Sequence, residues 1–106
     1  MFGLFRRKQK EVQPPAPQQK KIKVLPIGTV THFYNKIQVA IIDIENDHIS
    51  LGDILFIKGP KTRFRQRVKS IEYNHQKISK APEGYQIGLQ VGARAFAGDK
   101  IFKELN

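Results

Sequence analysis

The most constraining feature of the sequence is the short interval at which its apolar runs are interrupted. From Ile22 onward, Ile, Val, Phe and Tyr come in short runs bounded by Gly, Asn-Asp or Gly-Asp, and no stretch keeps a 3.6-residue apolar period. Short runs separated by turn-forming residues are typical of small β-barrels and sandwiches. The sequence therefore predicts an all-β domain, with strands near 23–34, 37–45, 53–58, 63–73, 86–91 and 100–104.

The N-terminal part of the chain has a different composition. Residues 1 to 23 carry seven Lys and Arg side chains but one acidic side chain, and EVQPPAPQQKK at 11–21 contains three Pro and three Gln. A segment this poor in large apolar residues cannot bury enough surface to offset the entropy lost on ordering. We therefore predict two parts, a disordered basic arm with a Pro/Gln-rich linker at 1–21 and a β-barrel domain at 22–106.

The overall composition limits the chemistry and the location of the protein. The 106 residues carry a formal net charge of +10 and contain no Cys, so disulfides, thiolate catalysis and thiolate zinc sites are excluded. No apolar run approaches the ~20 residues that a membrane span needs. The start, MFGLFRRKQK, places its charge after a very short apolar stretch, unlike a secretory signal. We expect a soluble, cytoplasmic protein without a transmembrane segment.

The predicted strand at 37–45 has apolar residues on both of its faces. Ala40, Ile42 and Ile44 share one face, because side chains of a strand alternate with a period of two. Val39 and Ile41 place apolar side chains on the opposite, outer face. Either a neighbouring strand or loop covers them, or they belong to a patch that docks on another protein.

The predicted strand at 63–73, TRFRQRVKSIEY in the sequence 62–73, has a row of cations. Four basic side chains lie two residues apart and so share one face. The apolar parity changes further along, at Ile71 and Tyr73, and a β-bulge near Ser70 would reconcile the two halves. Like charges along a strand protect its edge from pairing, but they also suit a phosphate backbone. The candidate nucleic-acid-binding residues are Lys58, Lys61, Arg63, Arg65, Arg67 and Lys69.

The run GTVTHFYNKIQVAIIDIENDHISLGDILFIKG, at 28–59, resembles domain 2 of elongation factor Tu and related translation GTPases. GTV opens a hairpin, and ISLGD at 49–53 forms the hydrophobic-x-x-Gly-Asp turn before the next strand. Ala81 and Leu89 match a later segment of the family's pattern, where Tyr85 replaces the usual Asp. The chain is also similar to the C-terminal barrel of collagenase-like peptidases. The predicted structural turn residues are Gly28, Gly52, Asp53, Gly84, Gly88, Gly98 and Asp99.

The resemblance extends over about residues 24 to 104 and implies a small closed Greek-key β-barrel of six to seven strands. Translation GTPases hydrolyse GTP in another domain, and the phosphate-binding motif G-x-x-x-x-G-K-[ST] is absent from this sequence. His32, His48 and His75 lie far apart, without the spacing of metal ligands. We predict no catalytic residues, no metal, no cofactor and no nucleotide binding, so the chain is not expected to be an enzyme.

Two functions remain open from the sequence. The first is a translation-associated RNA-binding module that contacts tRNA, rRNA or the ribosome through the basic strand. The alternative is a protein-docking accessory barrel that packs on a separate enzyme or factor through Val39 and Ile41. A third, weaker hypothesis is reversible lipid association through Phe2, Leu4 and Phe5 beside the first basic cluster.

Overall fold

The computed structural model describes residues 22–105, and all regular structure in this range is β-strand, as the sequence predicts. The predicted arm at 1–21 lies outside the described residues. The ten strands are β1 (Lys23–Tyr34), β2 (Val39–Ile44), β3 (His48–Ser50), β4 (Ile54–Gly59), β5 (Thr62–Arg67), β6 (Ile71–Tyr73), β7 (Gln76–Ile78), β8 (Lys80–Pro82), β9 (Gln86–Gln90) and β10 (Lys100–Leu105).

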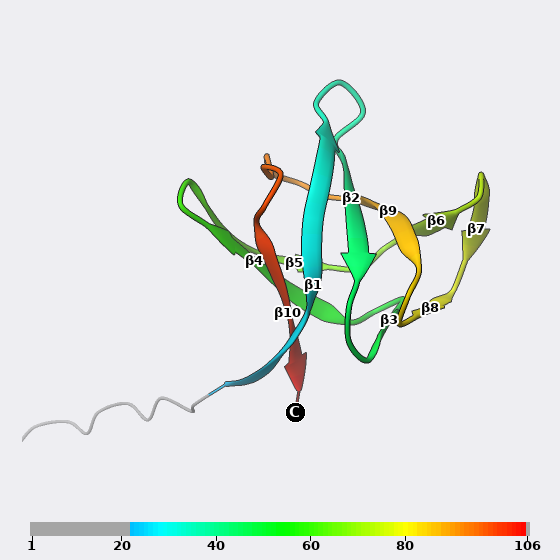
Figure 1. The fold of residues 1–106 in the computed structure, drawn as a ribbon, viewed down its shortest axis with the longest axis horizontal. Coiled ribbons are helices and arrows are strands. Elements are labelled where there is room, and N and C mark those ends of the chain that lie inside the picture. Colours follow the sequence, from blue (N-terminus) through cyan, green and yellow to red (C-terminus); the bar gives the residue numbers. More distant parts are fainter. Residues whose placement is uncertain (1–21, 106) are drawn as a thin grey trace, which may run out of the picture.

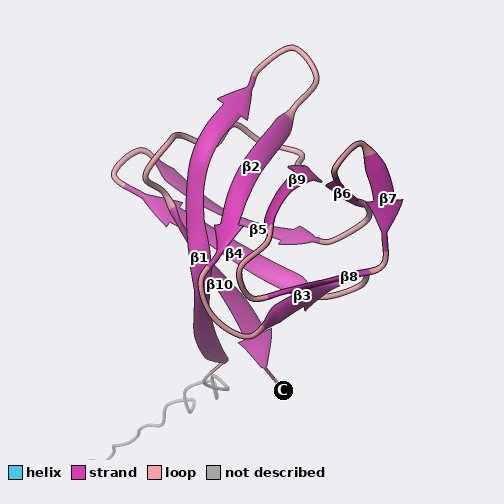
Figure 2. Cartoon of the chain, turned by 45° about the vertical axis from the view of Figure 1, so that its right-hand side comes forward, coloured by secondary structure: helices cyan, strands magenta, loops and turns pink. Residues whose placement is uncertain are grey.

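Eight of the strands form one sheet in the order β5-β4-β10-β1-β2-β9-β6-β7, and β3 pairs with β8 in a second, smaller sheet. All strand pairs are antiparallel. The long sheet curls around the core, with the small sheet at one end (Figures 1 and 2). Its two end strands, β5 and β7, do not pair with each other, so the sheet is not closed into a barrel.

The prediction of a closed barrel is therefore wrong, and the segment between β9 and β10 gives the physical reason. Residues 91–99 form no strand, so no ladder connects β5 to the far end of the sheet. A side chain of β5 contacts this segment instead, since Gln66 accepts a hydrogen bond from the amide of Gly92 at 2.8 Å. Strand pairing thus stops at β5, although the sheet curls far enough for β5 to contact the segment that follows β9.

The predicted strand at 63–73 is two strands, and no bulge at Ser70 joins them. The amide of Val68 still donates to the carbonyl of Asp53, but the carbonyl of Val68 accepts from Gly52. The amide of Asp53 is used in its own turn, where it donates to Ser50. This turn ends the β4–β5 ladder, and the chain then leaves to pair as β6 with β7 and β9.

The core lies inside the curled sheet and consists of aliphatic side chains from both sheets. Along β2 the buried residues alternate with half-buried ones, as the period-two pattern predicts. Full burial of one Ile or Leu contributes about 1.5–3 kcal/mol to folding. The buried core residues are Ile27, Val30, Ala40, Ile42, Ile44, Ile49, Leu55, Ile57, Val68, Ile71, Ala81, Ile87, Leu89, Val91, Ala95 and Ile101.

One turn geometry occurs three times around the core. Its glycines, Gly52, Gly84 and Gly98, have φ angles of 91°, 94° and 95°, which residues other than Gly rarely adopt. In two copies the next residue is Asp, and its carboxylate accepts from the amide three residues earlier, at 2.8 Å in each case. In the third copy Tyr85 follows the glycine, and only the backbone hydrogen bond to Pro82 remains, at 3.3 Å.

Two other glycines permit close approaches within the sheet. A Cβ atom at Gly28 would overlap the carbonyl oxygen of Asp43 on the paired strand β2. A Cβ atom at Gly88 would lie 3.3 Å from Val39 and 3.7 Å from Ile41. The missing side chains therefore leave room that neighbouring strands use.

Candidate functional site

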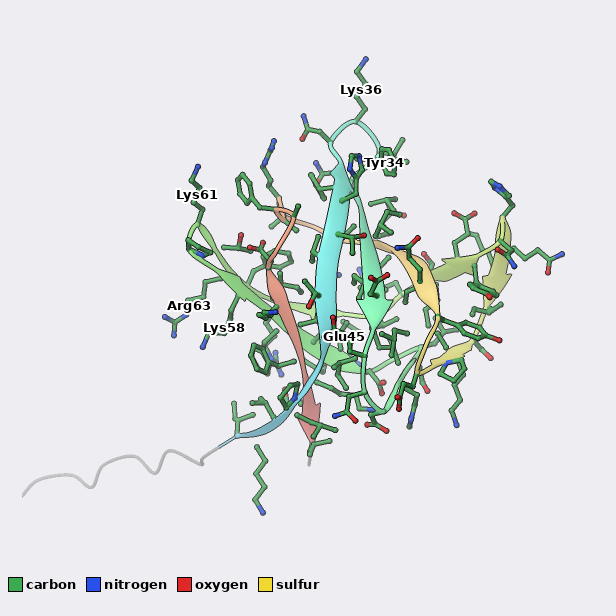
Figure 3. All side chains as sticks on the ribbon, in the orientation of Figure 1. Tyr34, Lys36, Glu45, Lys58, Lys61 and Arg63 are labelled. Carbon is green, nitrogen blue, oxygen red and sulfur yellow. The ribbon has the colours of Figure 1, made fainter. Side chains whose placement is uncertain are left out.

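The basic residues singled out in the sequence lie on and around the β4–β5 hairpin. Arg63, Arg65 and Arg67 are all exposed, and they alternate with less exposed residues along β5. Lys58 is exposed and pairs with Arg63 across the hairpin. Figure 3 shows Lys58 and Arg63 close together beside the hairpin, whereas Lys61 points outward from its tip.

The structure brings three of the six basic residues to one site and leaves the other three outside it. Lys58, Arg63 and Arg65 line a common groove. Arg67 instead donates to the carbonyl of Gly52 at 3.3 Å. Lys61 lies 5.5 Å from the centre of the Phe96 ring, and Lys69 follows the end of β5.

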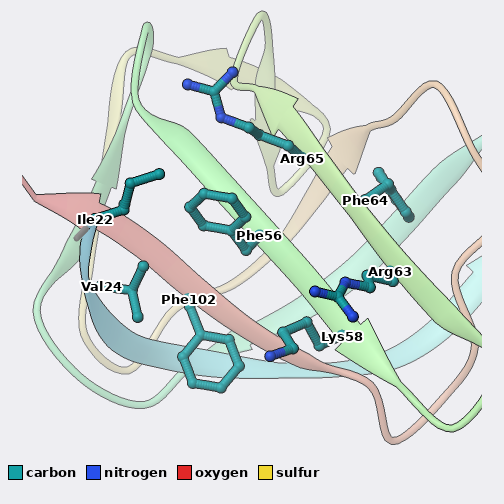
Figure 4. A pocket seen from close by; sticks show the side chains of 8 residues that line it. All are labelled: Ile22, Val24, Phe56, Lys58, Arg63, Phe64, Arg65 and Phe102. Atoms are coloured by element: carbon teal, nitrogen blue, oxygen red, sulfur yellow. The ribbon is translucent and has the colours of Figure 1, made fainter. Parts of the chain in front are cut away.

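The groove has a volume of about 570 Å³ and an apolar floor with cations along its rim (Figure 4). The pairing of β10 with β4, and of β4 with β5, places Phe102 opposite Phe56 and Phe56 opposite Arg65. The first residues of the described chain complete the floor. The lining residues are Ile22, Val24, Phe56, Lys58, Arg63, Phe64, Arg65 and Phe102.

Aromatic rings orient two of the cations at the groove. Lys58 Nζ lies 6.0 Å from the centre of the Phe102 ring, and the Arg65 guanidinium lies 5.9 Å from that of Phe56. Cations at such distances from a ring are attracted by its electron-rich face, by about 0.5–1 kcal/mol at exposed sites. Arg65 also forms an ion pair with Glu104 at 3.2 Å. Lys58 and Arg65 are thus held beside the apolar floor.

The apolar floor of the groove is the part that the sequence analysis missed. Ile22 and Val24 are 55% and 44% exposed, although both are aliphatic. The sequence signal is their spacing of two residues, which predicts a shared strand face. Their neighbours Phe56 and Phe102 come from distant segments, so only the strand pairing reveals the groove.

The alternative docking residues, Val39 and Ile41, lie on a different part of the sheet. Both are half-buried on β2, next to β9. Both side chains lie next to Gly88 of β9, where a Cβ atom would come within 4 Å of them, and Glu72 lies beside the same position. The chain itself therefore covers part of this patch, whereas Ile22 and Val24 in the groove are exposed.

A second polar cluster lies at the end of the molecule near the small sheet. The ammonium group of Lys103, whose side chain is 8% exposed, donates to the His48 carbonyl at 2.8 Å and to the Asp47 carboxylate at 2.9 Å. The Asp53 carboxylate lies 3.8 Å from the same ammonium group. The hydrogen bond from Lys103 lowers the pKa of Asp47 below its ordinary value of 3.8 and outweighs the opposing effect of partial burial. The geometry is that of a structural contact between β10 and the start of β3.

Residues 22–105 include no group of three or more His, Asp or Glu side chains arranged to hold a metal ion. Within the same range, no helix is long and apolar enough to cross a membrane.

No protein-family model matches the chain. It is 32% identical over 95 residues to an uncharacterised protease of Methanocaldococcus jannaschii, a match that covers 89% of this chain and 22% of that protein. It is 30% identical over 78 residues to a collagenase of Porphyromonas gingivalis, with 73% of this chain and 22% of that protein covered. The chain thus spans about a fifth of the length of these curated relatives.

Among solved structures, the C-terminal domain of a Geobacillus thermoleovorans protein assigned as a U32 peptidase superposes with a TM-score of 0.66 at 20% identity. The match covers 76% of this chain and 91% of that domain. This chain has the fold of that domain. A selenomethionine variant of the same domain gives the same TM-score and covers 72% of this chain. The similarity to the C-terminal domain of collagenase-like peptidases is therefore confirmed.

The main functional interpretation from the sequence, a translation-associated RNA-binding module, is wrong. The curated relatives are named as a protease and a collagenase, and the matching fold belongs to the C-terminal domain of a peptidase. These findings do not support the resemblance to domain 2 of elongation factor Tu. They favour the alternative, in which the domain is associated with a protein partner.

Proposed function

We propose that this chain is a non-catalytic accessory domain that docks on a peptidase-type enzyme. The observation that carries the proposal is the pair of matches in which 89% and 73% of this chain correspond to about a fifth of a protein named as a protease or collagenase. A segment that makes up about a fifth of each relative's length leaves most of that relative for other domains. The proposed role of the matching domain is to pack on one of them.

The groove on β1, β10, β4 and β5 is the surface that we assign to docking. Ile22 and Val24 supply exposed aliphatic area, and two aromatic rings lie beside them. Aromatic side chains and Arg are enriched at the centres of protein interfaces, and burying such anchors provides most of the binding energy. The patch at Val39 and Ile41 is the less favoured site, because the chain half-buries both side chains, whereas Ile22 and Val24 of the groove are exposed.

The test is a calorimetric titration against a defined enzyme. The partner is the Porphyromonas gingivalis collagenase from which the segment matching this chain has been deleted. The groove variant carries Ile22→Asp and Val24→Asp, and the matched control carries Ile37→Asp, which changes an aliphatic side chain that is 61% exposed at the turn after β1. We expect the groove variant to bind at least tenfold more weakly, equivalent to about 1.4 kcal/mol. The control should bind like the unchanged chain.

Thermal melts of both variants accompany the titration. The substituted side chains are exposed, so the melting temperatures should stay within a few degrees of that of the unchanged chain. An unchanged chain that does not bind the truncated enzyme, or two variants that bind equally well, would contradict the assignment of docking to this groove.

A further inference from the structure

The strand β5 forms one wall of the groove and is an open edge of the main sheet. It pairs with β4 and, among the described residues, with no other strand. Gly59 and Thr62 flank a two-residue hairpin turn and pair with each other. Residues that flank such a turn exchange both hydrogen bonds, and the hydrogen-bonded positions then alternate along the ladder. The backbone N–H and C=O groups of Arg63 and Arg65 therefore point away from β4.

The accessible part of this edge is short and well defined. At one end, the Arg67 carbonyl accepts from the side chain of its neighbour Gln66 at 3.0 Å. Beyond it, the backbone of Val68 is bonded to Gly52 and Asp53. Within the described residues, Arg63 and Arg65 have no second backbone partner, so the open edge is centred on these two residues.

The charge of this edge indicates which kind of strand it can accept. Arg63 and Arg65 are exposed, with Lys58 opposite Arg63 on β4. Like charges directly opposite each other destabilise a strand pair, whereas opposite charges stabilise it. A second copy of β5 would place Arg side chains next to Arg side chains. An acidic strand would pair with them instead.

The two faces of β5 set the pattern of the incoming strand. Arg63 and Arg65 project on one face, and Phe64 between them is half-buried. Figure 4 shows Phe64 on the side of β5 away from Phe56. Because neighbouring strands keep the same alternation, a segment with acidic residues two apart and an aliphatic residue between them would match both faces.

We propose that β5 receives an extended segment of the partner, of the pattern acidic-aliphatic-acidic, as an additional strand of the sheet. Its carboxylates lie against Arg63 and Arg65, its aliphatic side chain packs on Phe64, and its backbone bonds to the open edge. Strand addition of this kind gains affinity from backbone hydrogen bonds and specificity from alternate side chains. This inference rests on the proposed docking function and specifies the partner's chemistry at the same groove.

The test uses the full chain and a synthetic probe, an eight-residue peptide with blocked ends in which Glu and Val alternate. NMR hydrogen exchange reports the amides of Arg63 and Arg65, which should become protected on addition of the peptide. The amides of β7, the opposite edge strand, serve as the internal control and should not change. A peptide with Lys in place of Glu should not bind.

Two further comparisons separate strand addition from simple attraction between opposite charges. Methylating the backbone nitrogens of the peptide on its pairing side keeps its charge but removes its donors, and should weaken binding at least tenfold. Arg63→Gln with Arg65→Gln should also weaken binding several-fold, because both charges that face the carboxylates are removed. The matched control, Lys77→Gln on the exposed edge strand β7, should leave the affinity unchanged.

Equal binding of the methylated and unmethylated peptides would overturn the inference. Strong protection of Arg63 and Arg65 in the chain alone would also overturn it, because the edge would then already be paired. Neither result bears on the titration with the truncated collagenase. If that binding depends on Ile22 and Val24 while the peptide does not protect β5, the docking function stands and the added strand is wrong.

Discussion

Asp53 and Asp99 occupy the same position in two copies of one turn, but their surroundings differ. Both carboxylates accept from the amide three residues earlier. Asp99 is 1% exposed and Asp53 is partly accessible to water. These turns could be predicted from the sequence, because Gly-Asp is a local signal that depends on φ and on one short side chain. The burial of Asp99 could not be predicted, because its carboxylate lies against Gly59, which belongs to a hairpin distant in the sequence.

We predict that Asp99→Ala destabilises the domain more than Asp53→Ala does. Without the buried Asp99 carboxylate, the amide of Phe96 loses its acceptor in a partly buried turn, which costs about 1–3 kcal/mol. Water can replace part of the contact at Asp53. Urea unfolding of both variants measures the difference. Equal losses would show that burial of Asp99 does not govern the strength of this contact.

The contact between Lys103 and Asp47 makes stability depend on pH. Lys103 lowers the pKa of Asp47 in the folded state, so the ionised carboxylate stabilises the fold above the ordinary value of 3.8. This contribution is lost as the pH falls below 3.8 and through the lowered pKa. We therefore expect the stability gap between the unchanged chain and Asp47→Asn to narrow as the pH drops through this range. Chemical unfolding at a series of pH values measures the gap, and a gap that stays constant would contradict the role of Lys103.

At the scale of elements, long strands were predictable and very short ones were not. β1, β2, β4, β9 and β10 lie within two residues of their expected positions, because each has several alternations or a clear turn beside it. β3, β7 and β8 have three residues each, too few for a period to be recognised. The break between β5 and β6 was also missed, since it results from the Ser50–Asp53 turn that connects β3 to β4.

The β6–β7 hairpin offers a test of local backbone strain. Its two turn residues, Asn74 and His75, have φ angles of 52° and 65°, and Tyr73 pairs with Gln76 across them. Asn-Gly is the favoured sequence for such a turn, because glycine adopts positive φ without steric cost. We predict that His75→Gly stabilises the domain by about 0.5–1 kcal/mol. The control Gln76→Gly, in the adjacent strand, should destabilise it. Thermal unfolding measures the stability of both variants. A loss of stability in His75→Gly would contradict the claim that His75 is strained.

At the scale of the whole molecule, the sequence indicated the basic strand but not the surface to which it belongs. Alternation along 62–67 predicts the exposed Arg side chains, and the structure shows them exposed. The groove floor combines residues near 22, 56 and 102, which meet only through the β1–β10–β4 pairing. This surface depends on long-range contacts, which the sequence does not reveal. The charge of the strand alone therefore favoured a polyanion as the binding partner. The apolar floor of the groove and the peptidase relatives together favour a protein as the binding partner.

The most direct test of docking at the groove is a hydrogen-exchange map of the full chain with and without the truncated collagenase. We predict slower exchange in the peptides that contain Val24, Phe56 and Phe102, with little change around Val39 and Ile41. The groove variant with Ile22→Asp and Val24→Asp should lose this protection. Protection confined to the segment around Val39 and Ile41, or protection that persists in the groove variant, would contradict the central claim.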